Sequence, residues 1–369
     1  MYSQNDLDEA VAAGAMSAEA AASLRNFVDN QRHSPAVDEE NFRLITGFND
    51  IFVAIASAIL LFAVGFIGQW IGVRTGLVVE ADGPSFIAPL AVAATSWGLA
   101  LFFTAKRRMA LPSILLLLAF VMSVLAAAGF TLVMGVGSEA LDDKPQLGGV
   151  IASVSAAVAA AAAWVHWKRF RVPITVAAGA ASVAGIAIGL LVAALGQDAE
   201  QSKNAILGFV LFLGIGTFLF AMWWDGSDRA RITRRADVAF WLHLLAAPMI
   251  VHPIFTLLGL NDNSATIGEG LIAISLYVVL GLTALAIDRR ALLVSALAYV
   301  LYALNELFRE FGAVELNVAL TALVIGSALL MLSAFWTQAR AAVVRPLPDG
   351  LRERLPLINR PAASPAPAA

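Results

Sequence analysis

Few ionisable side chains interrupt the long apolar runs of this 369-residue chain, and those few are its candidates for chemistry. The run at 237–260 is the richest, because it contains His243 and His252 together with Pro248 and Pro253. An ionisable residue inside a membrane span is costly and marks a functional site by default. Each proline removes a backbone donor, so we expect this helix to kink and to offer carbonyl groups to a ligand, as interrupted helices do in transporters.

The phrase YALNELFREF contributes a second set of polar groups, Asn305 and Glu306. Counted from the cytoplasmic ends of their expected spans, His252 and Glu306 fall at similar depths at about 1.5 Å per residue. A histidine and a carboxylate that meet there could relay a proton, and Glu269 could join them. The alternative is structural: Glu306 pairs with Arg309 at the water boundary, and His252 bonds a carbonyl across the bundle.

His243 precedes His252 by nine residues, roughly 13 to 14 Å along a helix, so the two are not expected to share a metal ion. Its position leaves two interpretations open, a functional ring or a ring bonded to a carbonyl near the interface. We predict no metal site and no cofactor. The chain has no cysteine. It also lacks the phosphate loop, the H-E-x-x-H helix and the G-x-S-x-G elbow, which argues against ATP-driven transport.

The elements that position these residues follow from the composition. The chain is 60% hydrophobic and 14% charged, with a mean hydropathy of +0.80, whereas soluble chains are about half apolar and about a quarter charged. A helix needs about 20 apolar residues to cross a membrane. We therefore predict an all-α, polytopic helical membrane bundle of about ten transmembrane helices. The expected spans are 49–71, 84–104, 112–135, 147–167, 172–195, 204–224, 237–260, 266–287, 290–308 and 315–337.

Basic residues alternate from loop to loop along these expected spans. The loops after the second, fourth, sixth and eighth spans hold twelve lysines and arginines, whereas the intervening loops hold only four. Positive charge is retained on the cytoplasmic side during insertion, so we expect the basic loops and both termini to lie in the cytoplasm. The twelve residues are Lys106, Arg107, Arg108, Lys168, Arg169, Arg171, Arg229, Arg231, Arg234, Arg235, Arg289 and Arg290.

Small and aromatic residues indicate where the spans lie in the bundle and in the membrane. Small residues crowd 147–167 and 172–195, and such residues let helix backbones approach closely in lipid. We therefore expect these two spans in the interior of the bundle. Tryptophan rings favour the membrane interface, which is where we expect Trp70, Trp164, Trp167, Trp223, Trp224 and Trp336.

The two ends of the chain are expected outside the membrane domain, which we assign to residues 46–338. Residues 1–45 carry the pattern of a helical hairpin and a linker, with Gly14 as a stop and Ser17 as the N-cap of the second helix. The apolar stripe of this hairpin is short, so we expect it to dock on the membrane domain, a partner or lipid. Residues 339–369 lack periodicity and end in a proline- and alanine-rich stretch, so we predict a disordered tail.

Two phrases resemble a known class of proteins. The segment LDEAVAAGAMSAEAAASLRNFV, followed by a first span, is similar to the start of uncharacterised bacterial polytopic membrane proteins that are classed as domains of unknown function. The phrase DVAFWLHLLAAPMIVHPIF, at 237–255, resembles a phrase of bacterial membrane proteins of the same kind. The resemblance implies a bacterial inner (cytoplasmic) membrane protein and implies no activity.

The expected function is that of a secondary transporter or a flippase-like protein for a small molecule or a lipid, with its site among the seventh to ninth spans. One alternative is an intramembrane enzyme on lipid or glycan intermediates, with His252 and Glu306 as acid and base. Another is a non-catalytic scaffold or assembly factor. Membrane lipids are the expected partners, a protein could bind the N-terminal hairpin, and no nucleic acid is expected to bind.

Overall fold

The computed structural model describes residues 48–357 apart from 81–82, 200, 230, 232, 260–266 and much of 291–316, together with residues 11, 13–14 and 16–24. Within these residues the fold is all-helical and contains no strand. The helices are α3 (Phe48–Thr75), α4 (Ile87–Phe103), α5 (Ala110–Val136), α6 (Ser138–Asp143), α7 (Pro145–Phe170), α8 (Ile174–Leu195), α9 (Lys203–Gly226), α10 (Arg234–Leu257), α11 (Ile267–Ile287), α13 (Asn317–Ala334), α14 (Trp336–Val344) and α15 (Asp349–Arg352).

Six helices of the described part are long and apolar enough to cross a membrane, namely α3, α5, α7, α8, α9 and α10. A seventh candidate is the pair α13 and α14, which pass the same test together but are bent by 77° at their break. The helix α4 and the apolar part of α11 are shorter. Helices therefore coincide with nine of the ten expected runs, whereas the run at 290–308 lies largely outside the described residues.

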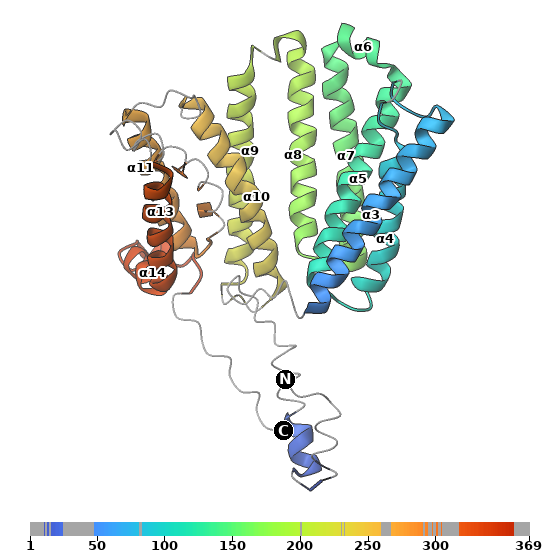
Figure 1. The fold of residues 1–369 in the computed structure, drawn as a ribbon. Helices are drawn as coiled ribbons and strands as arrows, with labels where there is room; N and C mark the ends of the chain where they lie inside the picture. Colours follow the sequence, from blue (N-terminus) through green and yellow to red (C-terminus); the bar gives the residue numbers. More distant parts are fainter. Residues whose placement is uncertain are drawn as a thin grey trace.

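The long helices stand side by side, and neighbours along the chain run in opposite directions (Figure 1). Packing follows the chain from α3 through α4, α5 and α7 to α8, then through α10 to α9. At the lower end of Figure 1 lie the connections 104–109, 171–173, 227–233 and 288–290, which carry most of the basic residues singled out above. We call this end of the bundle the basic end.

The closest helix contact joins α7 and α8 near the middle of the bundle (Figure 1). A Cβ atom added at Gly149 would lie 2.6 Å from the backbone oxygen of Gly189, and one added at Gly189 would lie 2.8 Å from the oxygen of Gly149. Only residues without a side chain allow backbones to meet this closely. The small residues of these two spans therefore have the packing role that the sequence predicted for them.

The predicted span at 315–337 corresponds to α13 to within a few residues. This helix ends at Ala334, and α14 starts at Trp336 in a new direction. Among the tryptophans expected at the interface, Trp336 is only 4% exposed and its indole Nε1 donates a hydrogen bond of 2.7 Å to Asp288. Trp70, Trp164 and Trp223 are all more than half exposed.

The prolines do not interrupt α10. This helix runs from Arg234 to Leu257 with Pro248 and Pro253 inside it. The seventh span is therefore one continuous helix, and the kink expected at its prolines stays a prediction. Half of its apolar stretch is buried inside the protein.

Both ends of the chain contain ordered segments. Ser17 Oγ accepts a hydrogen bond of 3.1 Å from the backbone N–H of Ala20, as expected of an N-cap. At the other end, part of the segment predicted to be disordered is ordered, because α15 forms and residues 352–357 are bound by arginine side chains. Residues 358–369 lie outside the described residues.

Candidate functional site

A buried ion network lies at the basic end of the bundle, and Asp225 is at its centre. Asp225 is in the last turn of α9 and is 1% exposed. Its carboxylate accepts a hydrogen bond of 3.2 Å from Arg289 Nε and a second, short one from the other end of the same guanidinium. The Nε atom of Arg231 lies 3.8 Å from the same carboxylate. Two guanidinium groups therefore face one carboxylate away from water.

His243 completes the first ring of contacts around Asp225. Its Nε2 atom lies 3.1 Å from Asp225 Oδ2, and because a carboxylate only accepts, Nε2 carries the proton of this bond. The ring is fully buried and packs edge-on against Phe218, with centroids 5.2 Å apart. Its Nδ1 atom has no hydrogen-bond partner among the described residues. Nδ1 can therefore take up a proton while Nε2 keeps its hydrogen bond to Asp225.

A second carboxylate, Asp288, extends the network toward α14. Arg231 donates to the Asp288 side chain at 3.1 Å and to the backbone oxygens of Asp288 and Ile287 at 3.1 and 2.9 Å. Trp336 donates to the other carboxylate oxygen, and Arg340 Nε lies 3.7 Å from it. The connection 288–290 is thus fixed from both sides.

The C-terminal segment closes the network from outside. Arg340 donates to the backbone oxygens of Pro356 and Leu357 at 2.8 and 3.1 Å. Arg229 donates to those of Leu355 and Arg352 at 3.0 and 3.1 Å. Residues 352–357 therefore cover the buried charges by binding arginine side chains through their carbonyl groups.

The local backbone is built to turn these side chains inward. Arg231 and Asp288 have φ values of 54° and 58°, in the left-handed region that non-glycine residues seldom adopt. Asp228 stabilises the turn before α10, because its carboxylate accepts bonds of 2.8 and 2.6 Å from the N–H and hydroxyl of Thr233. Strained residues of this kind persist where surrounding contacts determine them, and they cluster at functional sites.

Within the described residues, the network holds more arginines than carboxylates in direct contact. Arg231, Arg289 and Arg340 lie within 4 Å of two carboxylates, Asp225 and Asp288, and Asp237 interacts electrostatically with Arg289. Breaking a buried pair by removing one partner costs about 3 to 5 kcal/mol, because the remaining charge is left uncompensated. The network is therefore sensitive to any change in the charge of its members, protonation included.

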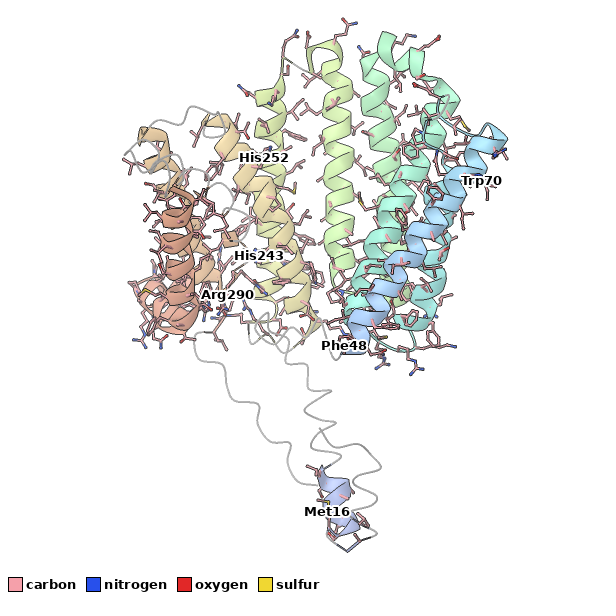
Figure 2. The ribbon with its side chains drawn as sticks, in the orientation of Figure 1. Met16, Phe48, Trp70, His243, His252 and Arg290 are labelled. Atoms are coloured by element: carbon pink, nitrogen blue, oxygen red, sulfur yellow. The ribbon has the colours of Figure 1, made fainter. Side chains whose placement is uncertain are left out.

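The candidates from the sequence fall in different places. His243 belongs to the network, whereas His252 is exposed near the opposite end of α10 (Figure 2). Asn305 and Glu306 lie outside the described residues, as does the side chain of Glu269, whose backbone is in α11. The predicted meeting of His252 with Glu306 therefore stays a prediction.

Sequence reasoning missed most of the network. It assigned Arg231 and Arg289 to the orientation of the loops and did not single out Asp225 or Asp288. One signal was present in the phrase WWDGSDRARITRR, which places two aspartates directly after an apolar run and among arginines. This loop carries both aspartates and arginines, whereas the loop at 106–108 carries only basic residues.

The described residues contain no cluster of three or more His, Asp or Glu side chains that could hold a metal ion. The only histidine of the network, His243, faces an aspartate and two arginines, and arginine is not a metal ligand. The chemistry that this arrangement supports is the binding of protons or anions.

Comparison of the chain with protein-family models, curated proteins and solved structures finds no match.

Proposed function

We propose that this protein is a proton-coupled secondary transporter whose coupling group is the buried pair of His243 and Asp225. The observation that carries the proposal is the hydrogen bond of 3.1 Å between these side chains, both fully buried in a helical membrane bundle beside two arginines. Ionisable residues buried in membrane helices mark proton relays and substrate pathways. Histidine is the side chain whose charge changes most readily near neutral pH.

The coupling follows from the charge balance of the network. Protonation of His243 adds a positive charge next to Arg289 and Arg231, which already share one carboxylate. The added charge weakens the hold of Asp225 on the arginines and favours an arrangement in which the connection 288–290 moves relative to α9. A proton and a solute are coupled when both bind better to the same arrangement.

The proposal includes the topology expected from the charge pattern. It has ten crossings, with the basic end and both termini in the cytoplasm of a bacterial inner membrane. The transported solute is a small molecule or a lipid. What supports this topology is the alternation of basic and non-basic connections between antiparallel helices (Figure 1).

Transport of a labelled solute into liposomes tests the proposal. A panel of small organic solutes and fluorescent lipids is offered under an imposed proton gradient to wild type, His243→Gln and His252→Gln. A glutamine amide can still donate to Asp225, but it cannot take up a proton. We expect wild type and His252→Gln to accumulate a solute, and His243→Gln to exchange it only down its own gradient. Accumulation by His243→Gln at the wild-type rate would refute proton coupling through this pair.

A second function, that of a membrane scaffold, is favoured by the way residues 352–357 are bound to Arg229 and Arg340. In that case the network fixes the C-terminal segment as part of a surface for another protein. His243→Gln would then behave as wild type in every flux assay. Alanine at His243 would lower the thermal stability and the capture of partners together.

A further inference from the structure

A pocket with four arginines lies at the basic end beside the buried network, and its Asp237 interacts electrostatically with Arg289. It has a volume of about 430 Å³ and is bounded by the connection between α4 and α5, the connection between α7 and α8, and the start of α10. The charged residues that line it are Arg108, Arg169, Arg171, Arg234 and Asp237. Four cations therefore face one carboxylate in a space large enough for a small ligand.

These arginines are available to an anion. All four are exposed, and within the described part of the chain none of them forms an ion pair with a carboxylate. Arg169 and Arg171 lie over the rings of Phe170 and Trp167, with guanidinium carbons 5.6 and 5.4 Å from the ring centroids. Stacking of this kind holds a guanidinium in place while its donors stay free to bind a phosphate.

A polar atom inside the pocket also lacks a partner. Thr104, at the end of α4, is 8% exposed and lines the pocket. Its hydroxyl has no hydrogen-bond partner among the described residues. A buried hydroxyl without a partner is costly, and a ligand oxygen in the pocket would satisfy it.

A separate apolar groove lies further along the bundle, toward the end opposite the basic end. It has a volume of about 560 Å³ and is lined by α5, α7 and α8 and by Leu141 of α6, mainly through leucine, valine, alanine and glycine. The floor is α7, which packs against both of the other helices, whereas α5 and α8 hardly touch each other. The groove also contains the buried hydroxyl of Ser155, which has no partner among the described residues.

The pocket and the groove are stacked along the same helices. On α5 the pocket includes Ile114 and the groove starts at Leu118, a distance of about 6 Å at about 1.5 Å per residue. The pocket ends at Pro173, directly before α8, and on α8 the groove starts at Ala178. A ligand with an anionic end and an apolar chain matches this order of surfaces.

We propose that the pocket and the groove together bind one anionic phospholipid, with its phosphate among the four arginines and an acyl chain between α5 and α8. Charge complementarity selects the occupant, because an apolar groove alone would accept any chain and the arginines alone would accept any phosphate. Basic pockets between membrane helices at this end are known to suit anionic headgroups. The lining of the pocket includes no member of the ion network, and the lipid proposal does not depend on proton coupling.

Two pairs of matched variants test the lipid site. Arg108→Gln with Arg234→Gln removes two pocket charges, whereas Arg107→Gln with Arg235→Gln removes the two neighbouring charges that do not line the pocket. Ser182→Trp fills the groove from α8, whereas Val183→Trp places the same ring on the exposed face of that helix. The measurement is the binding of phosphatidylglycerol or phosphatidylcholine to the full chain in detergent, counted by native mass spectrometry, with inorganic phosphate as competitor.

We expect wild type to bind phosphatidylglycerol at least about tenfold more tightly than phosphatidylcholine. The Arg108/Arg234 variant and Ser182→Trp should lose that preference, and both matched controls should keep it. Equal loss in the Arg107/Arg235 control would overturn the proposal, because a general surface charge would then explain binding. Full competition by inorganic phosphate with no effect of Ser182→Trp would also overturn it, in favour of a soluble anion. If Ser182→Trp does not fold, the competition decides: full displacement of phosphatidylglycerol by inorganic phosphate would overturn the proposal, and binding that resists phosphate would support it.

Discussion

The carboxylate of Asp225 is the residue on which the buried network depends. It is approached by His243, Arg289 and Arg231 from three different parts of the chain. Each of these side chains is buried, so none can exchange its partner for water. The cost of desolvating the arginines is offset only while the carboxylate is present and charged.

Replacing Asp225 with asparagine should therefore destabilise the protein strongly. The change keeps the shape of the side chain but removes its charge, and we expect a loss of about 3 to 5 kcal/mol. Thermal unfolding in detergent measures it, with Asp198→Asn as the control because Asp198 is an exposed carboxylate at the other end of the bundle. The double variant Asp225→Asn/Arg289→Gln should cost less than the sum of the single changes. Additive effects would show that the two side chains do not stabilise each other.

At the scale of elements, the bundle depends on the close contact between α7 and α8. Gly149 and Gly189 face each other across it, and each would meet the backbone of the other helix if it carried a Cβ atom. The neighbouring Gly148 has no atom within 4 Å of the position where its Cβ would lie. Alanine substitutions at these two adjacent glycines therefore distinguish the effect of packing from the effect of helix propensity.

We expect Gly149→Ala to destabilise the bundle by about 1 to 3 kcal/mol, because the added methyl group overpacks the contact. Gly148→Ala should be neutral or stabilising by up to about 1 kcal/mol, because alanine is the better helix former. The midpoint of thermal unfolding of each variant in the same detergent gives the comparison. A Gly149→Ala protein as stable as Gly148→Ala would mean that the two helices do not approach as described.

The helices themselves could be predicted from the sequence, but their contacts could not. Long apolar runs gave the ranges of α3, α5 and α7 to α10 to within a few residues, because hydropathy depends only on local composition. The bend before Trp336 was not predictable in this way, because it falls at the end of the apolar run and hydropathy does not give the direction of the helix that follows. What turns α14 away is contact with Asp288 and Arg290, and neither is local to it.

The ion network shows the same limit at the site. His243 was identified because it is an ionisable residue inside an apolar run. Arg231 and Arg289 were not, because a loop arginine that orients the chain and one that is buried against Asp225 look alike in a sequence. The partners are 18 and 64 residues apart, and only the packing of α9, α10 and the end of α11 brings them together.

At the scale of the whole molecule, the orientation in the membrane is the prediction on which the other proposals most depend. The chain has no cysteine, so single cysteines can report it without background. We expect Glu139→Cys and Asp198→Cys to react with a membrane-impermeant maleimide in intact spheroplasts of a bacterial host. Lys106→Cys and Ser227→Cys, at the basic end, should react only after the membrane is opened. The reverse pattern would place the basic end outside and refute the proposed topology.

Coupling of a proton to solute movement is the central claim for the whole molecule. The most direct measurement is proton uptake, recorded with a pH-sensitive dye trapped in liposomes, when a transported solute is added to one side. The account predicts proton uptake with the solute in wild type and in His252→Gln, and solute exchange without proton uptake in His243→Gln. If His243→Gln takes up protons with the solute as wild type does, the buried pair of His243 and Asp225 is not the coupling group.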